Sequence, residues 1–164
     1  MLYLLDADTL IRGDRDFYPL RRFPVFWRWL THQGASERVK IPVEQYEEIT
    51  VGRGELVEWL CTEEVREALV LREEADPALV ARVTLEGYGN LNEDEIEIVG
   101  RDPFLISYAL SSPANRCVVT FEVSAPNQRR GKRKIPDVCG VFGVQSCNLY
   151  GMMDALDFTT DWRP

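Results

Sequence analysis

The sequence is poor in the residue types that mark several common classes of protein. Its 164 residues include one histidine, and its four cysteines form no Cys-x-x-Cys pair, so we expect no zinc site. No apolar run approaches the ~20 residues that a membrane-spanning helix needs, so we expect no membrane association. The segment from Met1 to Asp6 lacks the basic start of a secretory signal. We therefore expect a cytoplasmic protein with free thiols.

Positive charge is also scarce. The chain has 19 Lys and Arg against 27 Asp and Glu, and its net charge of −8 by itself disfavours a nucleic-acid partner. The charge is unevenly distributed, however, because segment 128–134 holds five basic residues and no acid. Such a loop can contact a phosphate backbone, although a solvated surface loop is an equally good interpretation. The five basic residues are Arg129, Arg130, Lys132, Arg133 and Lys134.

What is present fits a single α/β domain spanning 1–164. Hydrophobic residues make up 45% of the chain, which is enough for a core at this length. Short apolar or β-branched runs predict strands, and apolar residues at helical spacing, often after Pro or Asp-Pro, predict helices between them. This alternation indicates a mainly parallel sheet. We expect strands at 2–5, 117–120 and 144–147, helices at 23–30, 43–49, 56–60, 62–71, 76–83, 104–110, 135–139 and 149–156, and irregular connections at 12–16, 32–40 and 86–99, the last with a short extended piece at 96–99.

Acidic side chains follow the predicted strands and open the neighbouring helices. Asp6 directly follows the first strand, and Glu122 lies just after the strand at 117–120. Because the carboxyl ends of parallel strands meet at one edge of a sheet, we expect these acids to lie close together. Clustered carboxylates repel one another unless a cation compensates them, and hard oxygen ligands select Mg²⁺ or Mn²⁺. Such ions support hydrolysis of phosphodiester bonds. The other acids at element ends or on an adjacent helix are Asp8, Glu47, Glu48, Asp102 and Asp137.

Most of these acids also have a purely structural interpretation. Asp102 precedes a proline and could simply start a helix, and Asp137 could cap one. Glu122 could be a solvated loop residue, and the pair at 47–48 could be the wet face of an amphipathic helix. Asp6 is harder to explain in this way, because a charge at the end of a buried strand is unfavourable unless it is paired.

Five segments, taken in order, resemble the PIN-domain nucleases, in particular the VapC-type toxins of toxin–antitoxin modules. Segment 3–11 (YLLDADTLI) is similar to that family's first strand and its Asp-Thr-Asn turn. Segments 45–49 (QYEEI) and 102–109 (DPFLISYA) are similar to the helices that carry its second and third acids. Segment 118–122 (VVTFE) resembles the Val-Val-Thr-x-Asp strand, and 135–144 (IPDVCGVFGV) resembles the closing motif.

The resemblance implies a three-layer α/β/α PIN-like domain with the activity of an Mg²⁺- or Mn²⁺-dependent endoribonuclease. It implies catalytic roles for Asp6, Glu48 and Asp102. It also implies that Asp6, Asp102 and Asp137 hold metal directly or through water, with Glu122 contributing to the same site. RNA would be the substrate, the basic loop would bind it, and a cognate antitoxin protein and a homodimeric partner are further implied.

Three further residues would support these acids. Asp8, Thr9 and Thr120 are expected to lie around the metal ligands, where the hydroxyl groups would bind an acid or the scissile phosphate. The chain departs from the family pattern at Asp8, where Asn or Ser is common, at the arginine before the third acid, and at Glu122, which replaces Asp. Because Glu is longer than Asp by one methylene, the pattern does not decide whether Glu122 contacts the metal directly.

Two alternatives compete with the nuclease hypothesis. The turn Asp6-Ala7-Asp8-Thr9 is close to the Asp-x-Asp-x-Thr turn of haloacid-dehalogenase-type phosphatases, but its Thr falls one place early and no lysine-bearing strand motif follows. The second alternative is a catalytically inactive PIN scaffold that binds RNA or protein. An aromatic set at 17–29 could stack on bases, but its helical spacing favours packing in the core or in a partner-binding groove.

Overall fold

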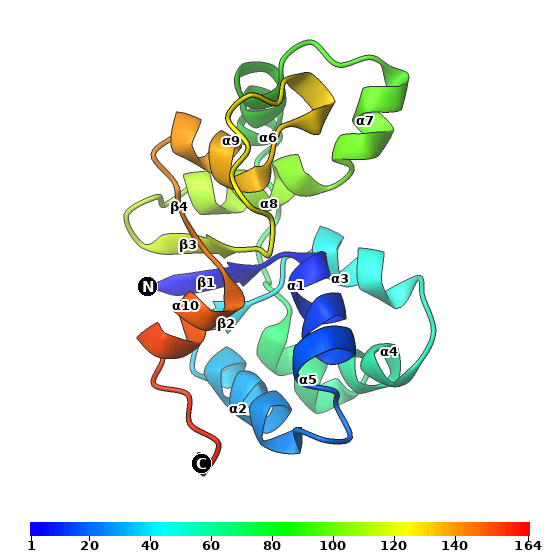
Figure 1. Ribbon diagram of the computed structural model, residues 1–164, viewed down its shortest axis with the longest axis vertical. Coiled ribbons are helices and arrows are strands. Elements are labelled where there is room, and N and C mark those ends of the chain that lie inside the picture. Colours follow the sequence, from blue (N-terminus) through cyan, green and yellow to red (C-terminus); the bar gives the residue numbers. More distant parts are fainter.

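Four parallel strands form the centre of the computed structural model, which describes residues 1–164 (Figure 1). They are β1 (Leu2–Leu5), β2 (Val39–Lys40), β3 (Arg116–Val119) and β4 (Gln145–Cys147), in the order β2-β1-β3-β4. Leu5 lies opposite Val119, and Val119 lies opposite Cys147, so β1, β3 and β4 end at the same edge. The chain adds β2 on one side of β1 and then β3 on the other, which creates a switch point between β1 and β3.

The side chains of the two central strands alternate between two hydrophobic clusters, one on each face of the sheet. Tyr3, Leu5 and Val119 belong to a cluster of 21 buried residues, whereas Leu4 and Val118 belong to a second cluster of 14. This period of two is what a strand buried on both faces requires. The structure is therefore the α/β/α sandwich expected from the sequence.

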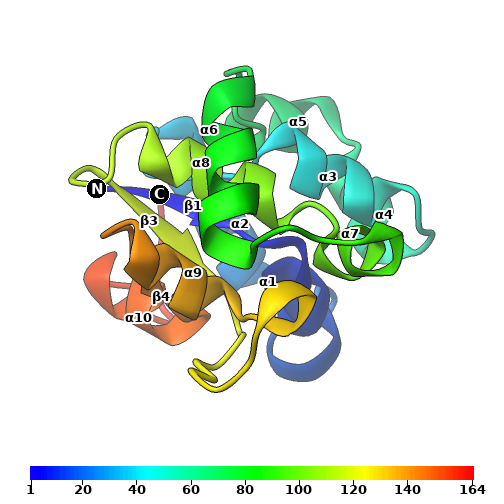
Figure 2. The ribbon, with the colours of Figure 1, turned by 90° about the horizontal axis from the view of Figure 1, so that it is seen from above.

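Each cluster is covered by its own layer of helices (Figure 1). In Figure 1 the larger cluster lies in the lower half, and the smaller one lies in the upper half. Viewed from above, α6, α8 and α9 lie over the central strands (Figure 2). The lower layer contains α1 (Ala7–Arg12), α2 (Pro24–Ala35), α3 (Val43–Thr50), α4 (Glu55–Leu60), α5 (Glu63–Leu69) and α10 (Leu149–Ala155), and the upper layer contains α6 (Pro77–Arg82), α7 (Glu93–Val99), α8 (Asp102–Leu110) and α9 (Ile135–Val141).

Three segments differ from the sequence prediction. Segment 86–99 was expected to be irregular, but it completes the π-helical turn η2 (Val83–Tyr88) and forms α7. Asn92 caps α7 by accepting a hydrogen bond from the Glu95 amide (2.9 Å), and Glu95 accepts one from the Asn92 amide (3.0 Å). The alternation Ile96-x-Ile98 suggested an extended piece, yet both side chains point to solvent from the helix.

The other two differences are shorter. Segment 32–40 completes α2 and then forms β2, and segment 12–16 belongs mostly to the π-helical turn η1 (Gly13–Phe17). The helix expected to reach residue 71 ends at Leu69. The longest helix, α2, has 12 residues, and none of the helices combines the length and apolar character that a membrane crossing needs.

Candidate active site

The carboxyl ends of β1 and β3 bring Asp6 against Thr120. The Asp6 amide and the Thr9 hydroxyl both donate to the Val119 carbonyl at 3.0 Å, which fixes the start of α1 beside the end of β3. The Thr120 hydroxyl donates to Asp6 Oδ2 at 2.8 Å. Asp6 is buried, with 7% of its surface exposed. Thr120 therefore binds an acid as expected, whereas the Thr9 hydroxyl is used to join two elements of the fold.

Asp102 opens α8 and belongs to the same electrostatic group as Asp6. Burial, and then the charges of Asp6, Glu122 and Glu48, raise the pKa of Asp102 to about 8. Burial likewise raises the pKa of Asp6 to about 6, with contributions from Asp8, Glu122 and Glu48, against the lowering effect of the Thr120 hydrogen bond. Asp6 lies between β1 and α1, and the other acids come from α1, α3, α8 and the segment after β3. Near neutral pH, the group keeps a proton that a bound cation would displace.

Helix α3 distinguishes its two adjacent acids. Glu47 forms an ion pair with Arg101 at 2.7 Å, and the same guanidinium donates to the Glu44 carbonyl, so this contact holds α3 to the start of α8. Glu48 is exposed and forms no ion pair, and its charge raises the pKa of both Asp6 and Asp102. The residue of this pair that faces the acidic group is therefore Glu48.

Glu122 is occupied in holding the first turn of α9. One of its oxygens accepts a hydrogen bond from Lys134 Nζ at 2.6 Å, and the other accepts one from the Ile135 amide at 2.7 Å. Its charge still raises the pKa of Asp6 and Asp102, so it lies close to them. In this arrangement Glu122 acts on the acidic group through its charge while its oxygens bind α9.

Asp137 lies apart from this group. It accepts hydrogen bonds from the Ser124 hydroxyl at 2.5 Å and from the Ala125 amide at 2.8 Å, which tie the loop after β3 to α9. The Ser124 hydrogen bond holds the pKa of Asp137 below its ordinary value, and no acid contributes to the shift. The structure thus brings together four of the five acids implied by the resemblance and gives Asp137 a bridging contact in a loop.

Asp8 lies in the first turn of α1, 3.7 Å from Arg12, and its charge contributes to the raised pKa of Asp6. Tyr88 was missed by the sequence analysis. Its hydroxyl lies 3.5 Å from Asp102 Oδ2, and burial raises the pKa of the phenol, so it remains a neutral donor facing the acid. Tyr88 falls in a segment expected to be irregular, where no periodic pattern marks it.

The basic segment 128–134 is largely bound within the protein. Arg130 makes a two-pronged ion pair with Glu95 of α7, at 2.7 and 2.6 Å, and Arg133 donates to a backbone carbonyl in η2. Lys134 is engaged with an acid as described above. The basic segment is therefore anchored to the protein, and it includes a short 3-10 turn, η3 (Arg130–Lys132). Three basic side chains of this segment form no ion pair, and of these Arg133 is held by backbone carbonyls, which leaves Arg129 and Lys132 without a partner outside their own loop.

The acidic group fits a hard divalent cation by its chemistry. No three His, Cys, Asp or Glu side chains converge closely enough to ligate one ion. Mg²⁺, however, is commonly held by one or two carboxylates, with water completing its coordination. Asp6 and Asp102 supply two such carboxylates. Burial and then the repulsion between acids raise their pKa values, and a cation would relieve that repulsion. These two residues are the ones that could hold Mg²⁺ or Mn²⁺.

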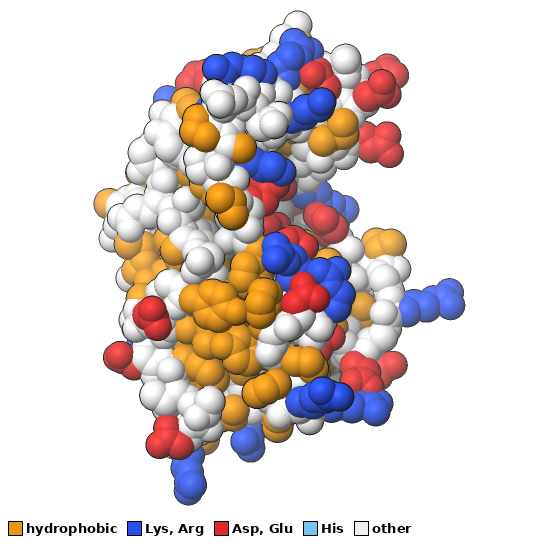
Figure 3. Space-filling view, in the orientation of Figure 1, with side chains coloured by type: hydrophobic (Ala, Val, Ile, Leu, Met, Phe, Trp, Pro, Cys, Tyr) orange, Lys and Arg blue, Asp and Glu red, His pale blue; other side chains and the backbone are white.

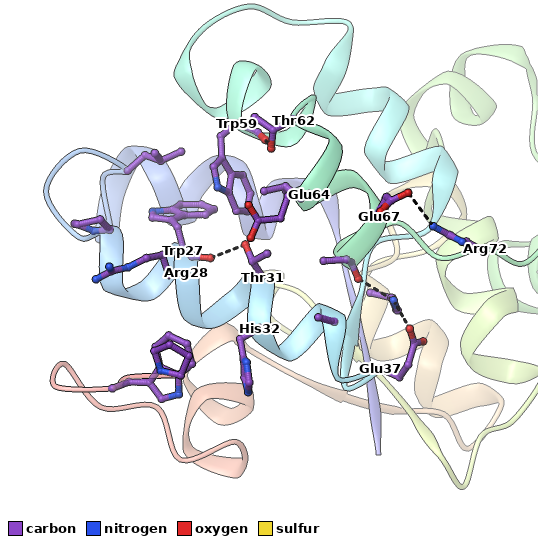
Figure 4. Close-up of a pocket in the computed structure, with 18 residues that line it drawn as sticks. Trp27, Arg28, Thr31, His32, Glu37, Trp59, Thr62, Glu64, Glu67 and Arg72 are labelled. Atoms are coloured by element: carbon purple, nitrogen blue, oxygen red, sulfur yellow. Dashed lines mark hydrogen bonds and ion pairs between the residues drawn. The ribbon is translucent and has the colours of Figure 1, made fainter.

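A cavity lies elsewhere, between α2, α5 and the C-terminal segment (Figure 4). Its volume is about 1050 Å³, and its walls include Trp27, Trp59 and Trp162 but none of the site acids. Charged side chains at its rim pair with one another: Glu67 with Arg72 at 3.8 Å, for example. Nothing in this lining selects a particular ligand chemistry.

The comparisons with known proteins give one match. No curated protein and no solved structure is significantly similar to this chain. Residues 3–160 match the family described as "Domain of unknown function (DUF4411)", and the match includes every acid discussed above. Because it covers nearly the whole sequence, the chain belongs to the DUF4411 family.

Proposed function

We propose that this protein is a metal-dependent endoribonuclease that hydrolyses RNA phosphodiester bonds. The observation that carries the proposal is the pair Asp6 and Asp102, whose pKa values are raised by burial and by neighbouring carboxylates at the switch point of the sheet. Strongly perturbed acids at such a position are typical of functional sites. The five-segment resemblance to PIN-domain nucleases supports RNA cleavage as the reaction.

The residues of the site suit this chemistry. Mg²⁺ or Mn²⁺, when bound, lowers the pKa of water and stabilises the negative charge that develops during displacement at phosphorus. Asp6 and Asp102 would hold the cation. The Thr120 hydroxyl donates to Asp6 Oδ2, so the other oxygen of that carboxylate would be available to the cation. Asp102 would hold the cation as its carboxylate, with its proton released to solvent, and the unpaired carboxylate of Glu48 can accept a hydrogen bond from a water molecule.

Phosphate contacts would come from the cations around the acids. Lys134 lies near Asp102, because the charge of that acid helps to raise the pKa of the ammonium, and only part of its donor capacity is used by Glu122. Arg129 and Lys132 have no ion-pair partner. Replacing all five basic residues of 128–134 with Gln should weaken RNA binding and flatten its salt dependence. We expect Arg129→Gln with Lys132→Gln to account for about 1.4 of the logarithmic salt slope on a single strand.

The decisive experiment is a cleavage assay with a single-stranded RNA in the presence of Mg²⁺ or Mn²⁺. The wild type should cleave, and Asp6→Asn and Asp102→Asn should not. Asp154→Asn, which removes an exposed acid on α10, is the matched control and should cleave normally. Equal cleavage by the wild type and Asp6→Asn would reject the assignment and point to a contaminating nuclease.

The same proteins discriminate the two alternatives. Release of phosphate from a small phosphomonoester, lost in Asp6→Asn, would favour the haloacid-dehalogenase-type phosphatase. Absence of Mn²⁺ binding by calorimetry, together with RNA binding but no cleavage, would favour the inactive scaffold. A nuclease should bind Mn²⁺ with an affinity that falls when Asp102 is replaced by Asn.

We further propose that the nuclease is the toxin of a toxin–antitoxin pair, with an antitoxin protein as its partner and a possible second copy of the chain in a homodimer. Expression of the wild type should then arrest growth, whereas Asp6→Asn should not. Co-expression of a small DNA-binding regulator encoded beside the gene should restore growth. Normal growth of cells that express an RNA-cleaving wild type would reject the toxin role and leave the nuclease activity intact.

A further inference from the structure

Three aromatic side chains that are not buried in the core gather beside the acidic group. The rings of Phe17 and Phe121 stack with centroids 5.0 Å apart and an interplanar angle of 28°. Tyr150 meets Phe17 edge-on at 5.7 Å and Phe121 at 6.4 Å. Tyr150 is 42% exposed, and the two Phe rings are half-buried. We call Phe17, Phe121 and Tyr150 the aromatic platform; its members come from η1, the segment after β3, and α10.

Most other aromatic residues of the N-terminal region have a clear structural role. Phe26, Trp27 and Trp29 of α2 are almost completely buried and fill the larger core cluster, as their helical spacing indicated. Phe17 belongs to the same stretch of sequence, but it turns towards Phe121 and Tyr150 at the surface. The aromatic set therefore divides into a packing group and a group whose rings remain partly accessible.

The platform lies close to the proposed site of cleavage. Phe121 directly follows Thr120, the residue that binds Asp6. The guanidinium of Arg12 lies over the Phe121 ring, 4.6 Å from its centre, and Arg12 ends the helix that begins just after Asp6. That helix of six residues is ~9 Å long. In Figure 3 an apolar patch lies between the positions of α1 and α10, beside charged side chains that border the hollow between the two halves.

We propose that the aromatic platform, together with Arg12, is a subsite that stacks an unpaired nucleobase next to the cation site at Asp6 and Asp102, an inference that rests on the proposed function. Aromatic faces accept any base by stacking, and an arginine on the same platform adds a cation beside the phosphate backbone. The subsite would favour single-stranded over duplex RNA, because a paired base cannot reach the rings.

A nucleobase fits the platform better than a protein does. Stable protein interfaces bury ~800 Å² on each partner, and three partly buried rings cannot supply that area. The charges around the platform also suit a nucleotide. Arg12 lies 3.7 Å from both Asp8 and Asp16, so it is held in place beside Phe121 by weak ion pairs. A phosphate can replace one of these contacts without leaving a buried charge.

The test uses Asp102→Asn in excess Mn²⁺ as the common background, so that the weakened cation site is filled and RNA is bound without being cleaved. Binding of a fluorescein-labelled single-stranded RNA of mixed sequence is measured by anisotropy with Phe121→Leu or Tyr150→Leu added. We expect each replacement to weaken binding by about 5- to 100-fold. The matched control is Phe142→Leu on the opposite helical layer. The Phe142 ring also has an arginine above it, since the guanidinium of Arg82 lies 5.5 Å from the ring centre. This replacement should leave binding unchanged.

A second series shows whether the lost contact is with a base. An abasic site is moved along the oligonucleotide one position at a time. At one position it should weaken binding to the Asp102→Asn background, and at that position Phe121→Leu should cause no further loss. The inference is overturned if the platform variants bind like the background, if no abasic position matters, or if the variants weaken binding to every abasic oligonucleotide equally.

The outcomes also separate this inference from the proposed function. If the wild type cleaves RNA and neither platform replacement changes binding, the subsite is wrong and the nuclease stands. If the wild type neither binds nor cleaves RNA, the proposed function fails. A change in sedimentation of Tyr150→Leu, with RNA binding unaltered, would assign the platform to a second copy of the chain and overturn the subsite. Circular dichroism checks that each variant is folded.

Discussion

Replacing Asp102 with Asn should make the metal-free protein more stable, most strongly at alkaline pH. In the folded protein Asp102 holds its proton up to a pKa of about 8, because it is buried and faces Asp6, Glu122 and Glu48. In the unfolded chain it loses that proton near its ordinary pKa of 3.8. Between these values the folded state binds more protons than the unfolded state. The free energy of unfolding therefore falls as the pH rises from about 4 to about 8, and the full penalty is present above that range.

The size of the effect follows from the same pKa values. A pKa of about 8 in place of 3.8 corresponds to at most about 6 kcal/mol, since each pKa unit is worth about 1.4 kcal/mol. Only part of this penalty is removed in the variant, because the repulsion between Asp6 and Glu48 remains. Asn keeps the shape and can still accept from Tyr88. We expect a gain of about 2–4 kcal/mol near pH 8 and almost none near pH 4.

Urea denaturation in EDTA, followed by circular dichroism over that pH range, measures this difference. The wild type should lose stability as the pH rises, and Asp102→Asn should lose much less, with unchanged slopes of free energy against urea. Asp154→Asn should follow the wild type. Added Mn²⁺ should raise the stability of the wild type at alkaline pH, because the deprotonated acids bind it, and should do little for Asp102→Asn. Identical pH dependence in the wild type and Asp102→Asn would refute the reasoning.

Two further predictions concern single contacts. Thr120→Val should lower the free energy of unfolding by about 1–3 kcal/mol, because a buried oxygen of Asp6 loses its hydrogen-bond donor. It should also raise the pKa of Asp6 further. Urea titration measures the first effect, and an NMR titration of the carboxyl carbon measures the second. Gly34→Ala should destabilise the protein by about 2 kcal/mol, because its new Cβ would lie 2.6 Å from the Leu69 side chain where α2 packs on α5. The control is Gly140→Ala, which has open space around it and should leave the melting temperature unchanged or higher.

The placement of acids at the carboxyl ends of the strands could be predicted from the sequence, because it depends on local patterns and on the topology of a parallel sheet. A short apolar run that ends at Asp6 marks a buried strand, and parallel strands place their following residues together. Strand β2 could not be found in this way. It has two residues, and one of them is Lys40, a buried lysine whose ammonium is held by the Ala68 carbonyl at 2.8 Å and by Glu37 at 2.7 Å. Those partners are invisible to any pattern read along the chain.

Contacts between distant segments also decided the roles of individual acids. Spacing along the chain does not distinguish Glu47 from Glu48, and only the resemblance favours Glu48. In the structure the two differ because Arg101, 54 residues away in the sequence, forms an ion pair with Glu47. Asp137 stands in a segment that resembles a family motif, yet the loop after β3 supplies it with two hydrogen-bond donors. Motif and spacing identify which residues are candidates, and the partners brought by the fold decide which of them face one another.

The net charge of −8 acquires a different meaning once the ion pairs are known. Two cations of the basic segment, Arg130 and Lys134, neutralise Glu95 and Glu122, so the segment offers far less free positive charge than its composition suggests. Asp6, Asp102 and Glu48 have no such partner and would repel a polyanion. RNA binding by this protein should therefore depend strongly on divalent cation, which reverses the repulsion, and only weakly on monovalent salt, because few counterions are released. A steep salt dependence in the absence of divalent cation would require a basic surface that these ion pairs do not leave available.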